Sequence, residues 1–370
     1  MQQIETTYKA NGGKFQRYKI SDLFNIYSPS KRFNANAVKF GGKYPYVVRT
    51  SQNNGIRDYI TEDDKYLSPA NTFSFGQDTA TVFYQDKPYF TGDKIKIMKL
   101  KVGNLNKERA CYLLAIIRKA FSNFSWGQTS FNETILNNVE IIIPTKNEKI
   151  DFEYMEKFIN ILEEERLQIL ETYLQVNNLD NCQLTDAEQL ALDKVTNKDI
   201  KFKEFKLNDL FTSQTGDVDI QRKHLNGKGT TYINSGITNC GVIGKTDFPA
   251  KIFKPNTITV DMFGNSYYRD FEYKMATHAH VFSLTPKEKF NKQIGLYICA
   301  ATDYFKKCYS FSDMCNWNKM KKNNIILPVT INNTIDYDFI ETYIKAIEKK
   351  VIQKVITWKD SEMKTLKTVS

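Results

Sequence analysis

The sequence repeats itself once, and this internal repeat constrains the fold more than any other feature. Residues Phe15–Phe24 (FQRYKISDLF) return as Phe202–Phe211 (FKEFKLNDLF), with five of the ten positions identical. Later blocks recur in the same order, at offsets between 184 and 187 residues: Tyr46, Asn53 and Gly55 match Tyr232, Asn239 and Gly241, and Ile141–Pro144 matches Ile325–Pro328. Because each copy is far longer than a solenoid repeat, we predict two similar domains, each with its own core.

Each copy ends in a stretch whose apolar residues recur three and four positions apart, the spacing of one helix face. Asp151 precedes the first stretch and Asp336 the second, and Asp is a favoured helix N-cap. The pattern predicts helices over residues 151–176 and 335–370. Two copies of one apolar line in a chain favour pairing of the helices with each other, with packing of each helix on its own domain as the alternative. The residues expected in the pairing are Met155, Ile159, Leu162, Ile169, Tyr173, Ile340, Ile344, Ile347 and Val351.

The rest of each copy alternates short runs of β-branched and aromatic residues with turns. Thr72–Phe75 and Thr257–Val260 are such runs, and helices are predicted over Lys107–Phe121 and Asn291–Phe305. We therefore expect an α+β chain in which each repeated domain is a mixed α/β globule. Its predicted parts are a first domain (1–150), a helix (151–176), a polar connector (177–201), a second domain (202–334) and a second helix (335–370).

The composition restricts the partners and the compartment. The formal net charge is +10, and a basic surplus of this size favours a polyanionic partner such as nucleic acid. No apolar run approaches the roughly 20 residues of a membrane span, and the first residues lack the basic and apolar regions of a signal peptide. The six cysteines include no CxxC pair, and we expect them to be reduced thiols of a cytoplasmic protein.

The order of globular part, long helix, globular part and long helix resembles the specificity subunit of type I restriction–modification systems, and the related specificity chain of type IIB systems. Each globular part opens with FxxxKxxDLF, continues through a Tyr…Asn-x-Gly loop and closes with IIxP. The resemblance covers nearly the whole chain. It implies two target-recognition domains held apart by an antiparallel coiled coil, each recognising one half of a split double-stranded DNA site in the major groove.

The resemblance also implies what the chain works with. Adenine methyltransferase subunits are the expected partners, and a restriction or translocase subunit is a further candidate. No catalytic residue is expected in this chain. S-adenosylmethionine, and ATP and Mg²⁺ where they are used, would be bound by the partner subunits.

Direct recognition of bases needs side chains with paired donors and acceptors, carried on loops of a rigid frame. Polar loops of this kind lie at three aligned places in each copy. In the first copy the expected DNA contacts are Arg49, Thr50, Ser51, Asn53, Asn54, Gln77, Thr79, Lys87, Trp126, Gln128 and Thr129. In the second copy they are Asn234, Ser235, Thr238, Asn239, Asn265, Ser266, Tyr268, Arg269, Asn316, Trp317 and Lys319. Turn chemistry also explains many of these residues, because Asn, Gly and Ser favour turns without a ligand.

Two other functions stay open at this point. Asp261, followed by Glu272 and Lys274, resembles the pattern of a metal-dependent DNA nuclease, although Val260 stands where a proline is usual. The first copy has no counterpart of this pattern. The other alternative is a coiled-coil scaffold that has no role on DNA.

Two further patterns are set aside. Gly244–Thr246 resembles the end of a phosphate-binding loop, but Asn239 stands where the first glycine of that motif belongs. His278 and His280 are explained by alternate residues on one face of a strand, and no further ligands are spaced to complete a metal site.

Overall fold

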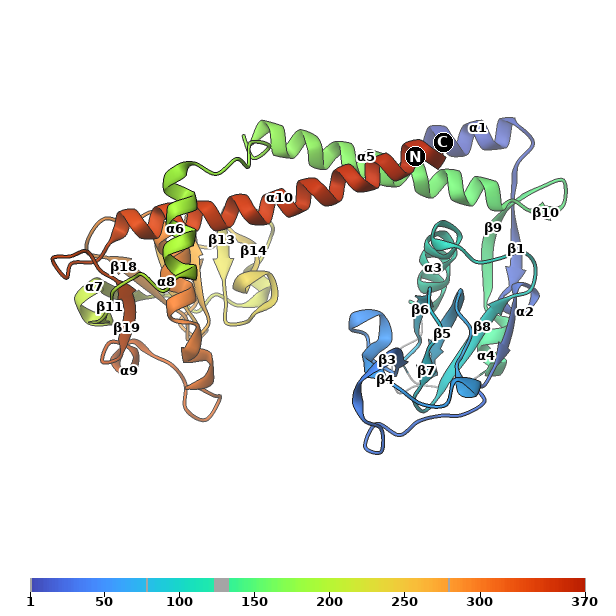
Figure 1. Ribbon diagram of the computed structural model, residues 1–370, viewed down its shortest axis with the longest axis horizontal. Coiled ribbons are helices and arrows are strands. Elements are labelled where there is room, and N and C mark those ends of the chain that lie inside the picture. The colour runs from blue at the N-terminus through green and yellow to red at the C-terminus, as the bar shows by residue number, and fades with distance from the viewer. Residues whose placement is uncertain (1, 78, 123–132, 279, 370) are drawn as a thin grey trace. The chain divides into compact units, whose positions relative to one another are not determined.

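The structure is a computed structural model that describes residues 2–77, 79–122, 133–278 and 280–369 (Figure 1). The chain divides into two compact units. Unit 1 comprises Met1–Tyr173 and Glu362–Ser370, and unit 2 comprises Leu174–Ser361. The two long helices, α5 (Phe152–Val176) and α10 (Tyr337–Val369), therefore each contribute residues to both units.

The repeated opening and closing motifs pair with each other. In unit 1, β1 (Lys14–Lys19) runs antiparallel to β9 (Glu140–Lys146), and β10 (Lys149–Ile150) extends this sheet. In unit 2, β11 (Phe202–Lys206) pairs in the same way with β19 (Asn324–Pro328). Each motif pair thus closes one unit, and a one-turn helix follows the opening strand, α2 (Ile20–Leu23) or α7 (Leu207–Leu210).

The two remaining sheets of each unit have the same strand order. A four-stranded sheet has the order β2 (Phe24–Tyr27), β8 (Ile95–Leu100), β5 (Thr72–Gly76), β6 (Thr81–Gln85) in unit 1 and β12 (Phe211–Thr215), β18 (Phe282–Pro286), β15 (Thr257–Val260), β16 (Ser266–Arg269) in unit 2. A three-stranded sheet has the order β4 (Ile56–Ile60), β3 (Phe40–Val47), β7 (Phe90–Thr91) in unit 1 and β14 (Val242–Thr246), β13 (Thr230–Ile233), β17 (Tyr273–Met275) in unit 2. The contacts β3–β7 and β13–β17 are both parallel. The predicted pair of similarly folded α/β domains is confirmed.

One helix packs against the four-stranded sheet in each unit and completes its core. It is α3 (Lys107–Phe121) in unit 1 and α8 (Lys292–Ala301) in unit 2. Asn106 caps α3 by accepting from the Arg109 amide at 2.9 Å, and Asn291 caps α8 by accepting from the Ile294 amide at 3.0 Å. The last phenylalanine of the repeated motif is buried in each core, Phe24 in unit 1 and Phe211 in unit 2.

The remaining described helices are short. They are α1 (Gln2–Ala10), α4 (Glu133–Asn138), α6 (Asp186–Thr196) and α9 (Trp317–Met320), with 3-10 turns at Asn53–Gly55, Asp64–Tyr66, Arg222–His224, Thr238–Gly241 and Asp303–Lys307. Helix α1 precedes the first copy and packs on α5 through Tyr8, whose ring centroid lies 3.9 Å from that of Tyr154. Helix α6 precedes the second copy.

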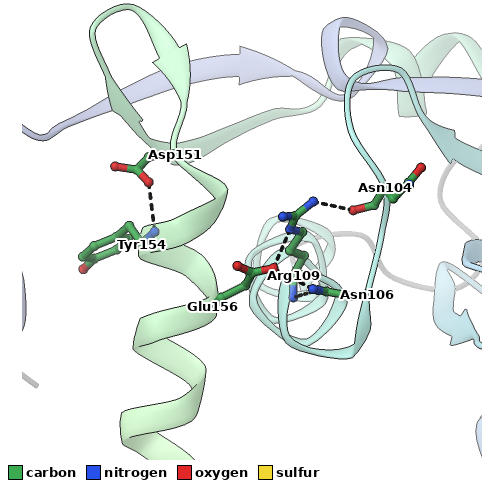
Figure 2. A network of polar contacts seen from close by, with 6 residues as sticks. All are labelled: Asn104, Asn106, Arg109, Asp151, Tyr154 and Glu156. Atoms are coloured by element: carbon green, nitrogen blue, oxygen red, sulfur yellow. Dashed lines mark hydrogen bonds and ion pairs between the residues drawn. The ribbon is translucent and has the colours of Figure 1, made fainter. Parts of the chain in front are cut away.

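Polar contacts attach the first turn of α5 to unit 1 (Figure 2). Asp151 accepts from the Tyr154 amide at 2.9 Å and caps the helix, and Asp336 does the same for α10 with the Phe339 amide at 3.0 Å. Figure 2 also shows Arg109 of α3 between α5 and a loop, where its Nε donates to Glu156 Oε1 at 2.9 Å. The direction in which α5 leaves the domain is therefore fixed by hydrogen-bonded side chains.

Helix α6 is attached to α10 within unit 2 by a buried ion pair. The Lys349 ammonium lies 2.7 Å from Glu188 Oε2, whose side chain is 8% exposed. Burial disfavours the charge, but hydrogen bonds from Lys349 and from the Thr185 amide hold the pKa of Glu188 below its ordinary value. The segment between the two copies is therefore partly docked rather than a free linker.

Replacing Lys349 with methionine should destabilise unit 2 by about 1–3 kcal/mol at pH 7, because it leaves a buried carboxylate without its partner. A depressed folded-state pKa stabilises the protein above the ordinary carboxyl pKa, and this stabilisation is lost as the pH falls through the folded-state value. The difference from wild type in urea unfolding should therefore shrink in acid. Lys350→Met, at an exposed neighbouring position, is the control and should unfold like wild type.

Candidate nucleic-acid interface

Each unit carries a loop that turns on three consecutive left-handed residues. The backbone φ angles are 46°, 54° and 78° at Asn53, Asn54 and Gly55, and 47°, 51° and 78° at Asn239, Cys240 and Gly241. The left-handed region is unfavourable for residues other than glycine, and asparagine tolerates it best. We call these two segments, residues 48–55 and 234–241, the turn loops.

The same hydrogen bonds close both turn loops. The Asn53 side-chain amide donates to the Ile56 carbonyl at 3.0 Å, and that of Asn239 donates to the Val242 carbonyl at 3.2 Å. The Gly55 carbonyl accepts from the Val48 amide at 2.8 Å, and the Gly241 carbonyl accepts from the Asn234 amide at 2.9 Å. The backbone frame has thus been kept in both copies, whereas the exposed residues between its fixed points differ.

The turn loop of unit 1 carries five of the eleven contacts predicted for the first copy. Arg49, Ser51, Asn53, Asn54 and, outside the loop, Lys87 are exposed, and Thr50, Gln77 and Thr79 are half-buried. A Cβ placed on Gly76 would lie 3.5 Å from Arg49 Cγ and 2.7 Å from Thr79 Oγ1, so the two polar loops are neighbours. Trp126, Gln128 and Thr129 lie outside the described residues.

Three predicted segments come together in unit 2. The Gly236 amide of the turn loop donates to Asp261 at 3.1 Å, and the Cys315 amide donates to the Met262 carbonyl at 2.8 Å, which brings the 316–319 segment to the same place. Among the predicted residues, Thr238, Asn239, Asn316 and Lys319 are exposed, and Asn234, Ser235, Ser266, Tyr268 and Trp317 are half-buried. Ile237, which is 76% exposed in this turn loop, was not among the predicted contacts, because an apolar side chain carries no donor or acceptor pattern.

Two of the predicted contacts have buried side chains. Arg269 is 2% exposed and donates to Thr259 Oγ1 and to the Cys240 carbonyl, at 2.9 and 2.6 Å. Asn265 is 6% exposed and donates to the Asp261 carboxylate. Neither side chain can reach a base from these positions.

Some exposed residues also have local structural roles. Asn316 caps α9 by accepting from the Lys319 amide at 3.1 Å, and Lys319 Nζ donates to the Met314 carbonyl at 2.9 Å and forms an ion pair with Asp313. The ring of Tyr268 covers Gly295 of α8, where a Cβ would lie 2.3 Å from it.

The three residues of the nuclease pattern have separate contacts. Asp261 accepts from the amides of Phe263 and Asn265, both at 2.9 Å, and so closes its own turn. Lys274 Nζ donates to the Phe248 carbonyl at 2.7 Å, and Glu272 pairs with Lys254 at the surface. Within the described ranges, no group of three His, Cys, Asp or Glu side chains could hold a metal ion. The arrangement gives no support to a nuclease site.

The long helices bury only part of the predicted pairing line. Met155, Ile159 and Ile340 are buried, and Leu162, Ile344 and Ile347 are half-buried. Three of the predicted positions, Ile169, Tyr173 and Val351, are 60%, 57% and 56% exposed. On α5 the buried residues after Ile159 are Leu167 and Leu174, both 5% exposed. The apolar spacing favoured the line through Ile169 and Tyr173, whereas the structure buries the neighbouring line through Leu167 and Leu174.

Comparisons with known proteins agree with this repeated architecture. The family model of the type I restriction modification DNA specificity domain matches residues 13–172 and again 199–357. The specificity subunit S.BcgI of a type II restriction enzyme from Heyndrickxia coagulans is 25% identical over 345 residues, 92% of this chain and 96% of that one. The type I restriction–modification system S subunit from M. genitalium has a similar fold, with a TM-score of 0.53 and 17% identity, over 97% of this chain and 94% of that one.

The two family matches together cover most of the chain, which therefore belongs to the type I restriction–modification DNA specificity family. It carries two copies of the family domain, as the internal repeat predicted. Members of this family are the non-catalytic specificity subunits of restriction–modification systems, so the chain is a recognition subunit. None of the described helices is long and apolar enough to cross a lipid bilayer.

The frame of the turn loop can be tested with two matched glycine substitutions. In Gly241→Ala the new Cβ would lie 2.5 Å from the Asn234 carbonyl oxygen, whereas a Cβ on Gly227 would have no atom within 4 Å. The φ angles of the two glycines are similar, 78° and 75°, so the backbone strain of the two substitutions is matched. Gly227→Ala should therefore cost about 1 kcal/mol, from backbone strain alone, and Gly241→Ala about 3 kcal/mol or more. Equal urea-unfolding midpoints for the two variants would contradict the close packing of this turn.

Proposed function

We propose that the chain recognises a bipartite DNA site, with each unit binding one half of it through its turn loop and the polar segments beside that loop. We call the DNA bound by one unit a half-site. The observation that carries the proposal is the repeated turn: its strained backbone is the same in both units, while the residues exposed on it differ. Such a frame supports recognition of a different half-site by each unit.

The exposed side chains favour different bases in the two half-sites. Unit 1 presents Arg49, and Arg is suited to paired hydrogen bonds with guanine in the major groove. Unit 2 presents Ile237 and Thr238, whose methyl groups can contact the methyl group of thymine. Lys87 is exposed and is suited to a phosphate contact, which would orient unit 1 without selecting a sequence.

We propose that α5 and α10 form the antiparallel coiled coil that spaces the two units. Within unit 1 the end of α10 and the first half of α5 are joined through Lys107 of α3, whose Nζ lies 3.4 Å from Glu163 and 3.7 Å from Glu362. The pairing would use the line through Leu167 and Leu174 rather than the exposed Ile169 and Tyr173.

We further propose that this spacer holds adenine methyltransferase subunits, which bind S-adenosylmethionine. A restriction or translocase subunit using ATP and Mg²⁺ is a further partner of the same assembly. Because all of them act on cellular DNA, the place of action would be the cytoplasm.

The test is selection of bound sequences from random DNA by the chain assembled with its methyltransferase subunits. The expected result is two short conserved half-sites separated by unspecified bases, with binding that weakens steeply as salt is raised. Selection of one continuous short site would contradict the proposal. Failure to enrich any sequence, with the methyltransferase present, would support the scaffold alternative.

Replacing Arg49 with alanine should weaken discrimination in one half-site by about 1–3 kcal/mol and leave the other unchanged, because a base-specific contact is lost in unit 1 alone. Arg57→Ala removes the same charge from an exposed position on β4 of the same unit and is the matched control. Arg57→Ala should leave the base preference of both half-sites unchanged. Equal effects of both substitutions on the base preference would exclude Arg49 as a base contact.

A further inference from the structure

We propose that Gln85 and Arg269 are positioning residues for DNA recognition: each is buried behind a turn loop, donates to the carbonyl of its central left-handed residue, and so fixes the direction of the exposed side chains. We call these two residues the loop clamps. The inference rests on the proposed function, because it assumes that the turn loops contact DNA.

The clamp of unit 1 ends strand β6. Gln85 is 2% exposed, and its Nε2 donates to the Asn54 carbonyl and to Ser74 Oγ, both at 3.1 Å. The Asn54 side chain in turn donates to the Tyr84 carbonyl at 2.8 Å. The strained turn is thus attached to two successive residues of β6, and the Gln85 amide bridges it to the neighbouring strand β5.

The clamp of unit 2 makes the same contacts with a different side chain. Arg269 ends β16, is 2% exposed, and donates through Nη2 to the Cys240 carbonyl at 2.6 Å and through Nε to Thr259 Oγ1 at 2.9 Å. Cys240 is the central left-handed residue of its turn, as Asn54 is in unit 1.

The strand registers show that the clamps occupy one equivalent position. Gln85 pairs with Thr72 on β5, and Arg269 pairs with Thr257 on β15. The hydroxyl that completes each clamp lies two residues further along the partner strand, at Ser74 and at Thr259. The Gln85 amide in one copy and the Arg269 guanidinium in the other therefore donate to equivalent carbonyls and to equivalent hydroxyls.

The chemistry at this position indicates a role beyond filling the core. An apolar residue would fill the space, and burying the Arg269 charge on a carbonyl and a hydroxyl, rather than on a carboxylate, is unfavourable. Both residues provide a buried side-chain N–H donor to the turn. The two non-glycine residues of that turn are held in the unfavourable left-handed conformation. Without that donor the turn would be free to relax, and Arg49 or Ile237 would lose its fixed direction.

Three substitutions test the clamps. Gln85→Met and Arg269→Met remove the donor and keep an unbranched side chain, whereas Arg269→Gln gives unit 2 the clamp that unit 1 already uses. Lys274→Met is the matched control, because it removes another buried donor of unit 2, which contacts the Phe248 carbonyl and not the turn loop. All are compared with wild type in sequence selection with the methyltransferase subunits, and in amide hydrogen exchange of the free chain.

Arg269→Met should reduce base discrimination about tenfold or more in one half-site only, and Gln85→Met in the other only. Exchange at the Gly241 or Gly55 amide should accelerate by a similar factor in the corresponding variant. Arg269→Gln should restore most of both properties, which a general packing defect would not allow. Lys274→Met should leave the preference for both half-sites unchanged.

Unchanged discrimination and unchanged exchange in the methionine variants would overturn the inference, and so would equal weakening of both half-sites by one variant. If the wild-type complex selects no bipartite site, the proposed function fails. In that case the exchange rates still show whether Gln85 and Arg269 hold the turns, but the two residues have no role in DNA recognition.

Discussion

Backbone pairing between the first and last strands of each copy is the constraint on which the rest of the structure depends. The FxxxKxxDLF strand lies against the IIxP strand, β1 on β9 and β11 on β19, so the two ends of each domain meet. The long helix begins a few residues after this closure and is capped by Asp151 or Asp336. This pairing therefore brings the two ends of each domain together at the point where the long helix begins.

Within this closed frame, the variable part of each unit is small. The β2–β8–β5–β6 and β4–β3–β7 sheets of unit 1 have counterparts with the same strand order in unit 2. The capped helix and the left-handed turn recur as well, including the side-chain hydrogen bond made by Asn53 and by Asn239. The exposed residues of the turn loop differ, for example Ser51 in one copy and Ile237 at the aligned position of the other. A rigid scaffold with exchangeable loop residues lets one fold recognise many targets without losing stability.

The sequence was sufficient for the duplication, the two similar domains and the long helices, because repeated motifs and apolar periodicity are visible without coordinates. It was not sufficient for side-chain direction. Arg269 and Asn265 have the chemistry of DNA contacts, yet strand register and a tight turn bury them. Gln85 resembles a surface residue in the sequence, and only the pairing of β6 with β5 reveals it as a buried donor. Along α5, the apolar spacing favoured Ile169, and the burial of Leu167 instead depends on tertiary packing.

Domain duplication can show whether each copy recognises one half-site independently. Residues 202–329 would be replaced with a second copy of residues 15–145. Both domains would then carry the same loops, and each would be closed by pairing of its first and last strands, as β1 with β9. If recognition resides in the separate units, the assembled complex should select a site whose two halves have the same sequence. The bases formerly preferred by the second unit should no longer be enriched. Continued enrichment of two different halves would show that recognition does not reside in the separate units.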